Sequence, residues 1–138
     1  MKDRTYYVVY DGENISKYVS TTESKPSNWY DYSKLQWANI VVTDGQVSGN
    51  TITNATATTY LVWVPRYEYK ILNSVNDWSN MDTSNARTDV KFLNGTENNT
   101  DSGYQIPEAF WWDKNDDGIE DDGEQLTGYW ISKYQLND

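Results

Sequence analysis

The sequence contains no cysteine and no histidine. Without cysteine, the chain cannot form a disulfide, a thiolate zinc site or a cysteine nucleophile. Without histidine, it lacks the commonest general base, the commonest metal ligand and the usual proton switch near neutral pH. Paired carboxylates or a lysine are left for catalysis, and a pair such as Glu108 and Asp113 has no spacing that favours a glycosidase dyad. We therefore expect a protein that is not an enzyme.

Basic residues and long apolar runs are also scarce. The chain has 11 Lys and Arg against 21 Asp and Glu, a formal charge of -10, and no basic cluster that could bind phosphates. Nucleic acid is therefore not an expected partner. No stretch approaches the roughly 20 apolar residues of a membrane helix, so we expect no transmembrane segment. No signal peptide follows Met1, and we expect any export or anchoring element to lie outside this sequence.

Aromatic side chains are abundant: 7 Trp and 12 Tyr stand beside only 2 Phe. Trp and Tyr combine a flat apolar body with a polar edge, which suits half-exposed strands, sugar stacking and protein interfaces. Thr, Ser, Asn and Gly are frequent, whereas helix formers such as Ala and Leu are few. This composition predicts an all-β or β-dominated α+β fold: a twisted antiparallel sheet or sandwich with long loops and at most short helices. We expect a single extracellular domain over residues 1–138.

The longest strand signal is Tyr60 to Leu72, YLVWVPRYEYKIL. Large apolar side chains alternate along it at period two, which predicts a central strand. Pro65 marks a bulge or an open place in the ladder, because proline has no N–H to donate. Shorter strands are predicted at Thr5 to Tyr10, Ile15 to Val19, Gln36 to Val42, Asp89 to Leu93 and Leu126 to Leu136.

Several connections are characteristic as well. An Asp-Gly turn at Asp11 predicts a hairpin of the first two strands, and we expect the last strand in or beside the sheet of the central run. Residues 46–59 could form a long exposed hairpin or a flexible loop. Tyr104 to Trp112 reads as extended, and Val75 to Met81 could form one helical turn.

An acidic stretch, Asp113 to Glu124 (DKNDDGIEDDGE), matches the spacing of the twelve-residue calcium loop. Gly118 at position six would permit the sharp bend that lets alternate positions surround the cation. The flanks look like strands, and Glu120 stands where an apolar residue is usual, so only the loop matches and not a helix-loop-helix module. We expect calcium as a cofactor, bound weakly at about 10⁻⁴ to 10⁻³ M; an acidic turn that only keeps the surface soluble is the alternative. The ligands would be Asp113, Asn115, Asp117, the carbonyl of Ile119, Asp121 and Glu124.

Four aromatic residues are candidates for a ligand or partner contact. Trp111 and Trp112 point to opposite faces of an extended chain, so at least one should be exposed beside the acidic stretch. Trp29 and Tyr30 begin an aromatic-rich segment that could form a platform for a sugar ring or close one end of a core.

Two resemblances to known families rest on these stretches. The segments WYDYSKLQWANIVV, YLVWVPRYEYKI, DVKFLNGT, GYQIPEAFWW and LTGYWISKYQL, in this order, resemble a module of secreted or anchored, prepilin-like surface proteins of Gram-positive bacteria. YLVWVPRYEYKI and GYWISKYQL are also similar to the opening strands of the formylglycine-generating, or sulfatase-modifying, family, which has a C-type-lectin-like fold. The catalytic cysteines of that family have no counterpart here, so the second similarity implies only a shared arrangement of strands.

The first resemblance implies a location at the cell surface. It leads us to expect a non-catalytic extracellular module, structural or adhesive, of a bacterial surface appendage (a pilin-like subunit) or of an anchored surface protein, stabilised by calcium. Its partners would be other surface-protein subunits or host and cell-surface glycans. The alternative is a carbohydrate-binding module that uses exposed Trp and Tyr side chains.

Overall fold

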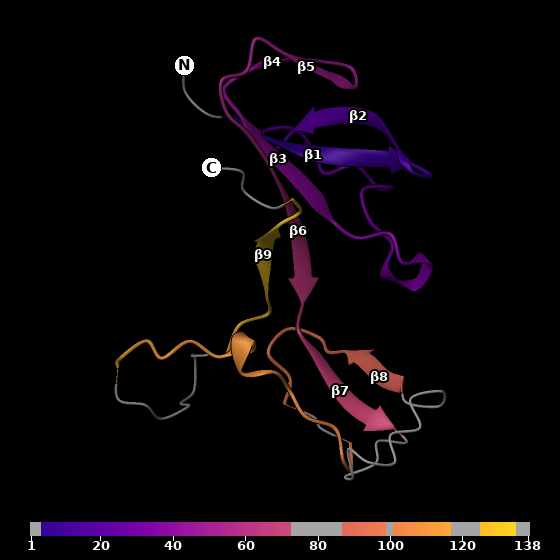
Figure 1. The fold of residues 1–138 in the computed structure, drawn as a ribbon, viewed down its shortest axis with the longest axis vertical. Coiled ribbons are helices and arrows are strands. Elements are labelled where there is room, and N and C mark those ends of the chain that lie inside the picture. The colour runs from indigo at the N-terminus through magenta and orange to yellow at the C-terminus, as the bar shows by residue number, and fades with distance from the viewer. Residues whose placement is uncertain (1–3, 73–86, 99–100, 117–124, 135–138) are drawn as a thin grey trace, which may run out of the picture. The chain divides into compact units, whose positions relative to one another are not determined.

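The computed structural model describes residues 4–72, 87–98, 101–116 and 125–134 (Figure 1). Strands dominate them, the sheets are antiparallel and no described helix reaches seven residues, which confirms the predicted β-dominated fold. Nor is any described helix long and apolar enough to cross a membrane. Contacts divide the chain into two compact units, residues 1–63 with 130–138 (unit 1) and residues 64–129 (unit 2). The single domain over residues 1–138 stays a prediction, because dense contacts within a unit do not test whether it folds alone.

A five-stranded antiparallel sheet with the order β2-β1-β3-β6-β9 organises unit 1. Its strands are β1 (Arg4–Asp11), β2 (Asn14–Ser20), β3 (Asn39–Thr43), β6 (Thr58–Pro65) and β9 (Gly128–Ser132). The predicted hairpin of the first two strands is confirmed, with Asp11 opposite Asn14 and Gly12 at φ 60 in the turn. Since β9 is the neighbour of β6, the predicted place of the last strand beside the central run is also confirmed.

Each face of this sheet carries its own apolar cluster, because side chains alternate along a strand. Tyr6, Val8 and Val41 form the buried centre on one face, and Val47 and Ile52 of the hairpin β4 (Gln46–Ser48) and β5 (Thr51–Thr53) pack against them. Residues 46–59 thus contain the hairpin that was one of two predicted alternatives. The centre on the other face consists of Trp29, Ala38 and Ile40, packed by Tyr7, Tyr32, Leu61 and Trp63.

Tyrosine hydroxyls form the polar border of the first cluster. The hydroxyl oxygens of Tyr18 and Tyr60 lie 2.6 Å apart. Lys133 Nζ donates to the Tyr10 hydroxyl at 2.6 Å and lies 4.5 Å from the centroid of that ring. Burial, and then the hydrogen bond to Tyr60, raise the pKa of Tyr18. The Tyr18 phenol therefore stays neutral and shares its hydrogen bond with Tyr60 at the edge of the core.

Asp44 and Gly45 hold the loop that follows β3. Asp44 accepts hydrogen bonds from the backbone N–H groups of Thr56 at 2.9 Å and Ala57 at 3.0 Å, and from the Thr56 hydroxyl. A Cβ at Gly45 would lie 2.8 Å from the Cβ of Ala55, so a larger residue does not fit. These contacts end strand β3 at the Thr-Asp-Gly sequence, in which Asp and Gly are turn-forming residues.

The run that reads as one central strand is divided at Pro65. β6 pairs with β3, whereas β7 (Tyr67–Leu72) pairs with β8 (Arg87–Phe92). The prediction that Pro65 opens the ladder is confirmed, but the prediction of one continuous strand is wrong. The backbone of Arg66 leaves both ladders: its N–H donates to Thr127 O at 2.9 Å and its carbonyl accepts from Leu93 N at 3.0 Å.

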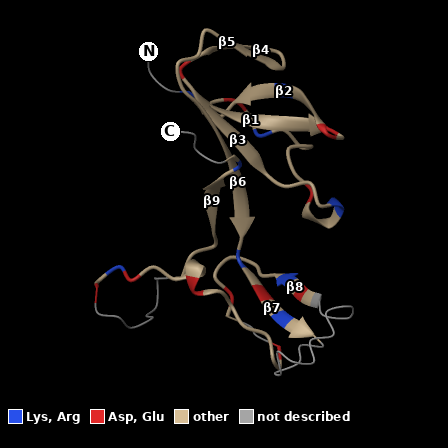
Figure 2. Ribbon diagram, viewed as in Figure 1, with Lys and Arg blue, Asp and Glu red and all other residues tan. Residues whose placement is uncertain are grey.

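In unit 2, the β7–β8 ladder places opposite charges across from each other. Glu68 lies opposite Lys91, and Lys70 lies opposite Asp89; Figure 2 shows how the sign of charge alternates along these strands. On its other side, β7 pairs through Tyr69 with Gln105, with N···O distances of 2.8 and 2.9 Å. The hairpin is therefore extended by a third, very short piece of chain.

The ring of Tyr104 fastens this third piece to the hairpin. Lys91 Nζ lies 4.1 Å and Lys70 Nζ 5.8 Å from the ring centroid, distances of cation–π contacts. The Tyr104 hydroxyl donates to Asp89, which raises the pKa of Tyr104. Lys91 pairs with Asp101, which raises the pKa of Lys91. One side of the hairpin is thus covered by neutralised charges and an aromatic ring.

Two predicted elements differ in extent, and a third lies outside the described residues. β3 begins at Asn39 and not at Gln36, because the 3-10 turn η1 (Tyr32–Lys34) and Leu35 at φ 57 redirect the chain. The stretch predicted as extended before the acidic residues contains the 3-10 turn η3 (Glu108–Phe110). The predicted helical turn at Val75–Met81 lies outside the described residues.

The last strand is also shorter than predicted, since β9 ends at Ser132. Period-two alternation would place Trp130 and Tyr134 on one face. Instead, Trp130 contacts Trp63 with ring centroids 5.2 Å apart, while Tyr134 contacts Tyr60 at 5.8 Å. The chain bends after the strand, and so the two rings join different clusters of the sheet.

Asp44→Asn should change how stability depends on pH. Hydrogen bonds from Thr56 and then Ala57 lower the pKa of Asp44 from 3.8 to about 2 in the folded state. Because the folded pKa is below the unfolded one, this contribution is complete above about pH 4 and is lost as the pH falls toward 2. The Tm of the wild type should therefore fall more steeply through this window than that of the variant, measured by circular dichroism. Asp11→Asn, at the exposed end of β1, is the control, and parallel wild-type and Asp44→Asn curves would contradict the role of Asp44.

Candidate functional site

Six aromatic rings of unit 1 form a continuous row, which we name the aromatic row. Neighbouring ring centroids along it lie 5.2 to 6.4 Å apart, mostly in tilted or edge-to-face geometry. Such geometry is favourable for aromatic pairs, because the positive edge of one ring meets the negative face of the next. In order, the row consists of Trp37, Tyr32, Tyr30, Trp29, Trp130 and Trp63.

Trp29 anchors the row in the core. It is only 8% exposed, its Nε1 donates to Asn39 O at 2.6 Å, and its ring packs edge-on against Tyr7 at 4.5 Å. On either side of it, Tyr30 and Trp130 are each 38% exposed. Trp29 therefore supports the row from below, and its two neighbours present the surface to a ligand.

The loop that carries Tyr30 and Tyr32 is rigid for local reasons. Asp31 pairs with Gln36 across the turn, with an N···O distance of 2.8 Å, and its carboxylate accepts from the N–H of Ser33 at 3.1 Å. Hydrogen bonds from Ser33 and then Lys34 lower the pKa of Asp31. The Tyr32 hydroxyl donates to the carbonyl of Trp63 at 3.3 Å, which ties the loop to β6.

The sequence identified only part of the row. Trp29, Tyr30, Tyr32 and Trp37 are close in the chain, and their density signals an aromatic surface. The sequence predicts Trp63 and Trp130 only as residues of two separate strands, because nothing local shows that β6 and β9 bring them to the same place. Their alternation within predicted strands is the one signal that could have pointed to the sheet face.

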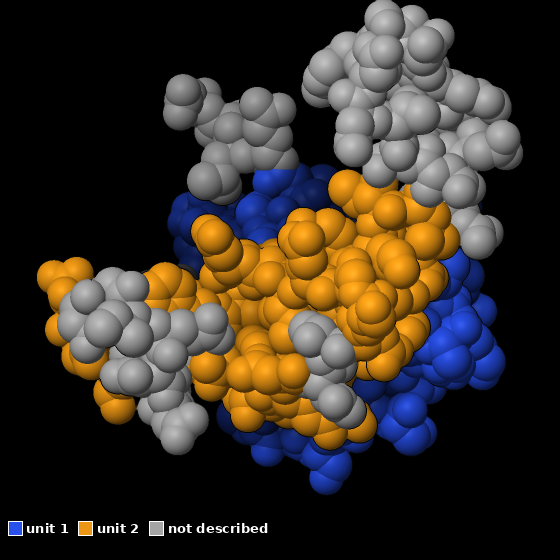
Figure 3. All heavy atoms as spheres, turned by 90° about the horizontal axis from the view of Figure 1, so that it is seen from below, with its two compact units in different colours: residues 1–63, 130–138 blue, residues 64–129 orange. Residues whose placement is uncertain are grey.

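Unit 2 is the part coloured orange in Figure 3, and among its described residues Arg66 is the most deeply buried charged side chain, at 1% exposure. Its Nε donates to Glu97 O at 3.0 Å, and its Nη1 donates to Phe110 O at 3.1 Å and Leu126 O at 3.3 Å. Its Nη2 donates to the Asn98 side-chain oxygen. A single guanidinium thus joins three separate segments of chain, and its charge is solvated by carbonyl dipoles.

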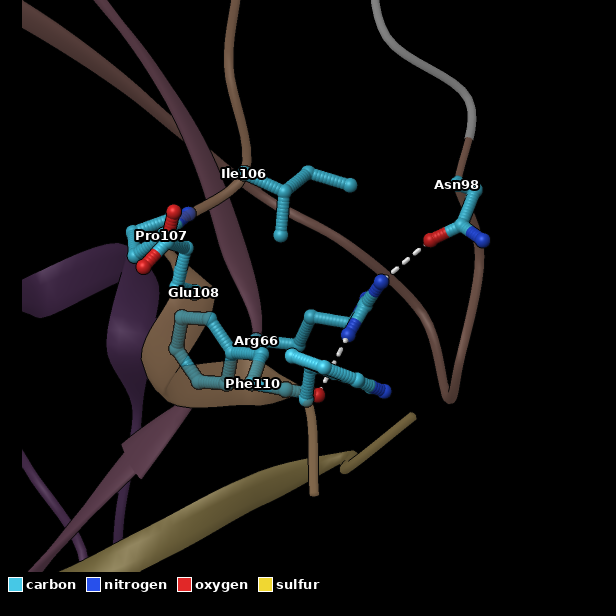
Figure 4. A pocket seen from close by; sticks show the side chains of 7 residues that line it. Arg66, Asn98, Ile106, Pro107, Glu108 and Phe110 are labelled. Atoms are coloured by element: carbon cyan, nitrogen blue, oxygen red, sulfur yellow. Dashed lines mark hydrogen bonds between the residues drawn. The ribbon is translucent and has the colours of Figure 1, made fainter. Parts of the chain in front are cut away.

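A pocket of about 320 Å³ lies beside this guanidinium. Figure 4 shows Arg66 reaching toward Asn98 and the Phe110 carbonyl, with Ile106, Pro107 and Glu108 around the same space. Apolar and polar groups share the wall, with Glu108 and Asn98 on different sides of it. The lining residues are Arg66, Asn98, Ile106, Pro107, Glu108, Phe110 and Trp111.

The Trp111–Trp112 pair divides as expected of neighbours in an extended chain. Trp111 is half-buried and lines the pocket, whereas Trp112 is 59% exposed. Trp111 pairs with Gln125 in an antiparallel bridge, and Leu126 N–H donates to Phe110 O at 2.7 Å. These bonds join the residues that flank the acidic stretch.

The structure describes only the beginning of the acidic stretch. Asp113 is half-buried, Asn115 is exposed, and Asp116 has φ 61. Within the part of the chain that the structure describes, no three acidic side chains gather in a way that could hold a metal ion. The calcium site stays a prediction, because its other ligands lie outside the described residues: Asp117, Ile119, Asp121 and Glu124.

Two buried polar atoms have no hydrogen-bond partner among the described residues: Asn39 Oδ1 and Glu68 Oε2. The backbone carbonyl of Asn39 accepts a hydrogen bond from the indole N–H of Trp29. The side-chain amide nitrogen of Asn39 donates to Trp37 O at 2.8 Å. Glu68 is 2% exposed in the middle of β7. A buried polar group that stays unsatisfied costs about 1 to 3 kcal/mol.

Comparison with family models, curated proteins and solved structures finds no match for this chain.

Arg66→Met should strongly destabilise the protein. The change keeps an apolar stem but removes the donors for the carbonyls of Glu97 and Leu126, and a buried acceptor without a donor costs about 1 to 3 kcal/mol. We expect the free energy of unfolding in urea to fall by about 3 kcal/mol or more. Arg66→Lys should not restore it, because one ammonium cannot reproduce the planar fork. Arg4→Met, at an exposed position of β1, is the matched control; equal stability of both methionine variants would refute the role of Arg66.

Proposed function

We propose that this chain is a non-catalytic extracellular module that adheres to glycans through the aromatic row. The observation that carries the proposal is the continuous row of five contacts among six rings, which include the half-exposed Tyr30 and Trp130. Flat rings held by a rigid sheet offer apolar contact area at low entropic cost, since few torsions remain to be ordered on binding. Sugar rings have apolar C–H faces that stack on such side chains.

The charges of the chain favour a neutral glycan. At a formal charge of -10, the protein repels polyanionic polymers and attracts none of them by long-range steering. Near the row, Lys25 Nζ lies 5.2 Å from the Tyr30 ring centroid, and Lys34 pairs with Asp31 at 3.1 Å. These groups supply donors and acceptors for hydroxyls beside the rings. The row is longer than one sugar ring, so an oligosaccharide would use it best.

The cell-surface location belongs to the same proposal. It is supported by the resemblance to prepilin-like surface proteins of Gram-positive bacteria, by the acidic composition and by the absence of cysteine. In this role the chain is a structural or adhesive subunit of a surface appendage or anchored protein. Its partners are glycans or neighbouring subunits of the same assembly.

Calcium at Asp113 to Glu124 would stabilise unit 2 in this setting. Support comes from the ligand spacing and from the Trp111–Gln125 bridge, which brings the ends of the stretch together. Seven acidic side chains among twelve residues repel one another without a cation. Binding of calcium would therefore add to the stability of the folded state only.

Trp130→Ala and Tyr30→Ala should each weaken binding to neutral polysaccharides. Each variant removes an exposed ring from the row, and we expect the Kd to rise by about tenfold, the equivalent of about 1.4 kcal/mol. Binding is measured by sedimentation with insoluble cellulose and chitin and by fluorescence titration with soluble β-glucan. Trp112→Ala, which removes a 59% exposed ring outside the row, should bind as the wild type does. No binding to any of these polymers, or equal losses in all three variants, would disprove the proposal.

Calcium should raise the Tm of the wild type relative to chelator. At about 100 times its Kd, a ligand stabilises the folded state by about 2.7 kcal/mol, which is readily visible in a thermal melt. Asp117→Ala should abolish the shift, whereas Glu23→Gln, an exposed residue of unit 1, should keep it. If calcium leaves the wild-type melt unchanged, the acidic stretch acts only as a solvated surface.

A further inference from the structure

The pocket of unit 2 has the size of a site for one small ring. Its volume of about 320 Å³ is at the lower end of the roughly 300 to 1,000 Å³ found for ligand pockets. Four of its seven lining residues are apolar: Ile106, Pro107, Phe110 and Trp111. Because Trp111 and Gln125 are held by a backbone bridge, this wall is built before any ligand arrives. A single compact molecule with one apolar face fits such a space.

The buried guanidinium does not make this pocket an anion site. The donors of Arg66 are directed to Glu97 O, Phe110 O, Leu126 O and the Asn98 side chain. A carboxylate or phosphate would have to displace those acceptors and leave them buried without a donor. The exposed carboxylate of Glu108 on the same pocket also repels an anion.

A cation is disfavoured as well, because the positive charge of Arg66 lies within the wall. Among the described lining residues, the charges of Arg66 and Glu108 balance. The ligand that matches is therefore uncharged, with one apolar face and several groups that both donate and accept hydrogen bonds.

Two polar groups remain for such a ligand. Arg66 donates to the oxygen of the Asn98 amide, and this bond fixes the orientation of the amide, so its NH₂ group, which has no partner among the described residues, can donate to a ligand. The Glu108 carboxylate is an acceptor. A donor on one side of the pocket and an acceptor on the other, with apolar side chains between them, are complementary to two separate hydroxyls on a sugar ring.

We propose that this pocket binds one neutral hexopyranose ring, with its apolar face against Trp111 and Pro107 and its hydroxyls toward Asn98 and Glu108. The site is formed by residues of unit 2 alone and shares none with the aromatic row. The proposal therefore does not rest on the proposed function. It assigns a second mode of recognition, a single ring in a pocket, beside an extended glycan on a row.

The test is a ¹H–¹⁵N NMR titration of the full chain with glucose, galactose, mannose and N-acetylglucosamine. At least one of them should shift both the Asn98 side-chain amide and the Trp111 indole signal, with a fitted Kd. Glu108→Gln should weaken that binding by about tenfold, as expected for the loss of a hydrogen bond to a charged group. Asn98→Asp keeps the acceptor for Arg66 but removes the NH₂ donors, and it should also weaken binding while the melting curve stays that of a folded protein. Glu13→Gln, an exposed glutamate of unit 1, is the control and should bind as the wild type does.

Several outcomes would overturn the proposal. One is that no neutral hexose shifts these two signals; another is that Glu108→Gln and Asn98→Asp bind as tightly as the wild type. Preferential binding of glucosamine or glucuronate would show a charged-ligand site instead. Trp130→Ala should leave hexose binding unchanged. Loss of hexose binding in that variant would show that the aromatic row, and not the pocket, binds the hexose. Failure of polysaccharide binding by the row leaves this result unaffected, because the two sites are read out by different residues.

Discussion

The buried guanidinium of Arg66 is the interaction on which unit 2 depends. A charge at 1% exposure is tolerable only if its donors are occupied, and here backbone carbonyls of three segments and one amide occupy them. These segments have little regular structure of their own, since η3 is a single 3-10 turn and residues 93–98 contain no strand. The hydrogen bonds of the Arg66 side chain thereby hold together segments that no β-ladder joins at Pro65. The pocket lies between the same segments.

In unit 1, both faces of a small sheet are covered although the chain has few aliphatic residues. Large rings fill the space: tyrosines border one face, and tryptophans with tyrosines cover the other. Rings of this size cannot all be buried completely in a unit so small, so some remain half-exposed. The aromatic row is therefore partly buried in the core and partly exposed at the surface.

The two candidate sites differ because their supports differ. The row lies on a sheet, where ladder hydrogen bonds fix the spacing of side chains over several strands, and it suits an extended ligand. The pocket lies among loops that one side chain holds together, and it suits a single compact ring.

Local pattern determined the type of fold. Period-two alternation and turn residues are properties of neighbouring positions, so β1, β2 and the break at Pro65 followed from the sequence, as did the opposite exposure of Trp111 and Trp112. The tertiary structure alone decided which distant segments meet. Trp130 joins Trp63, and Arg66 joins Asn98 and Phe110, because sheet order and the need to satisfy a buried charge select those partners. Such choices depend on burial and long-range pairing, which no local periodicity encodes.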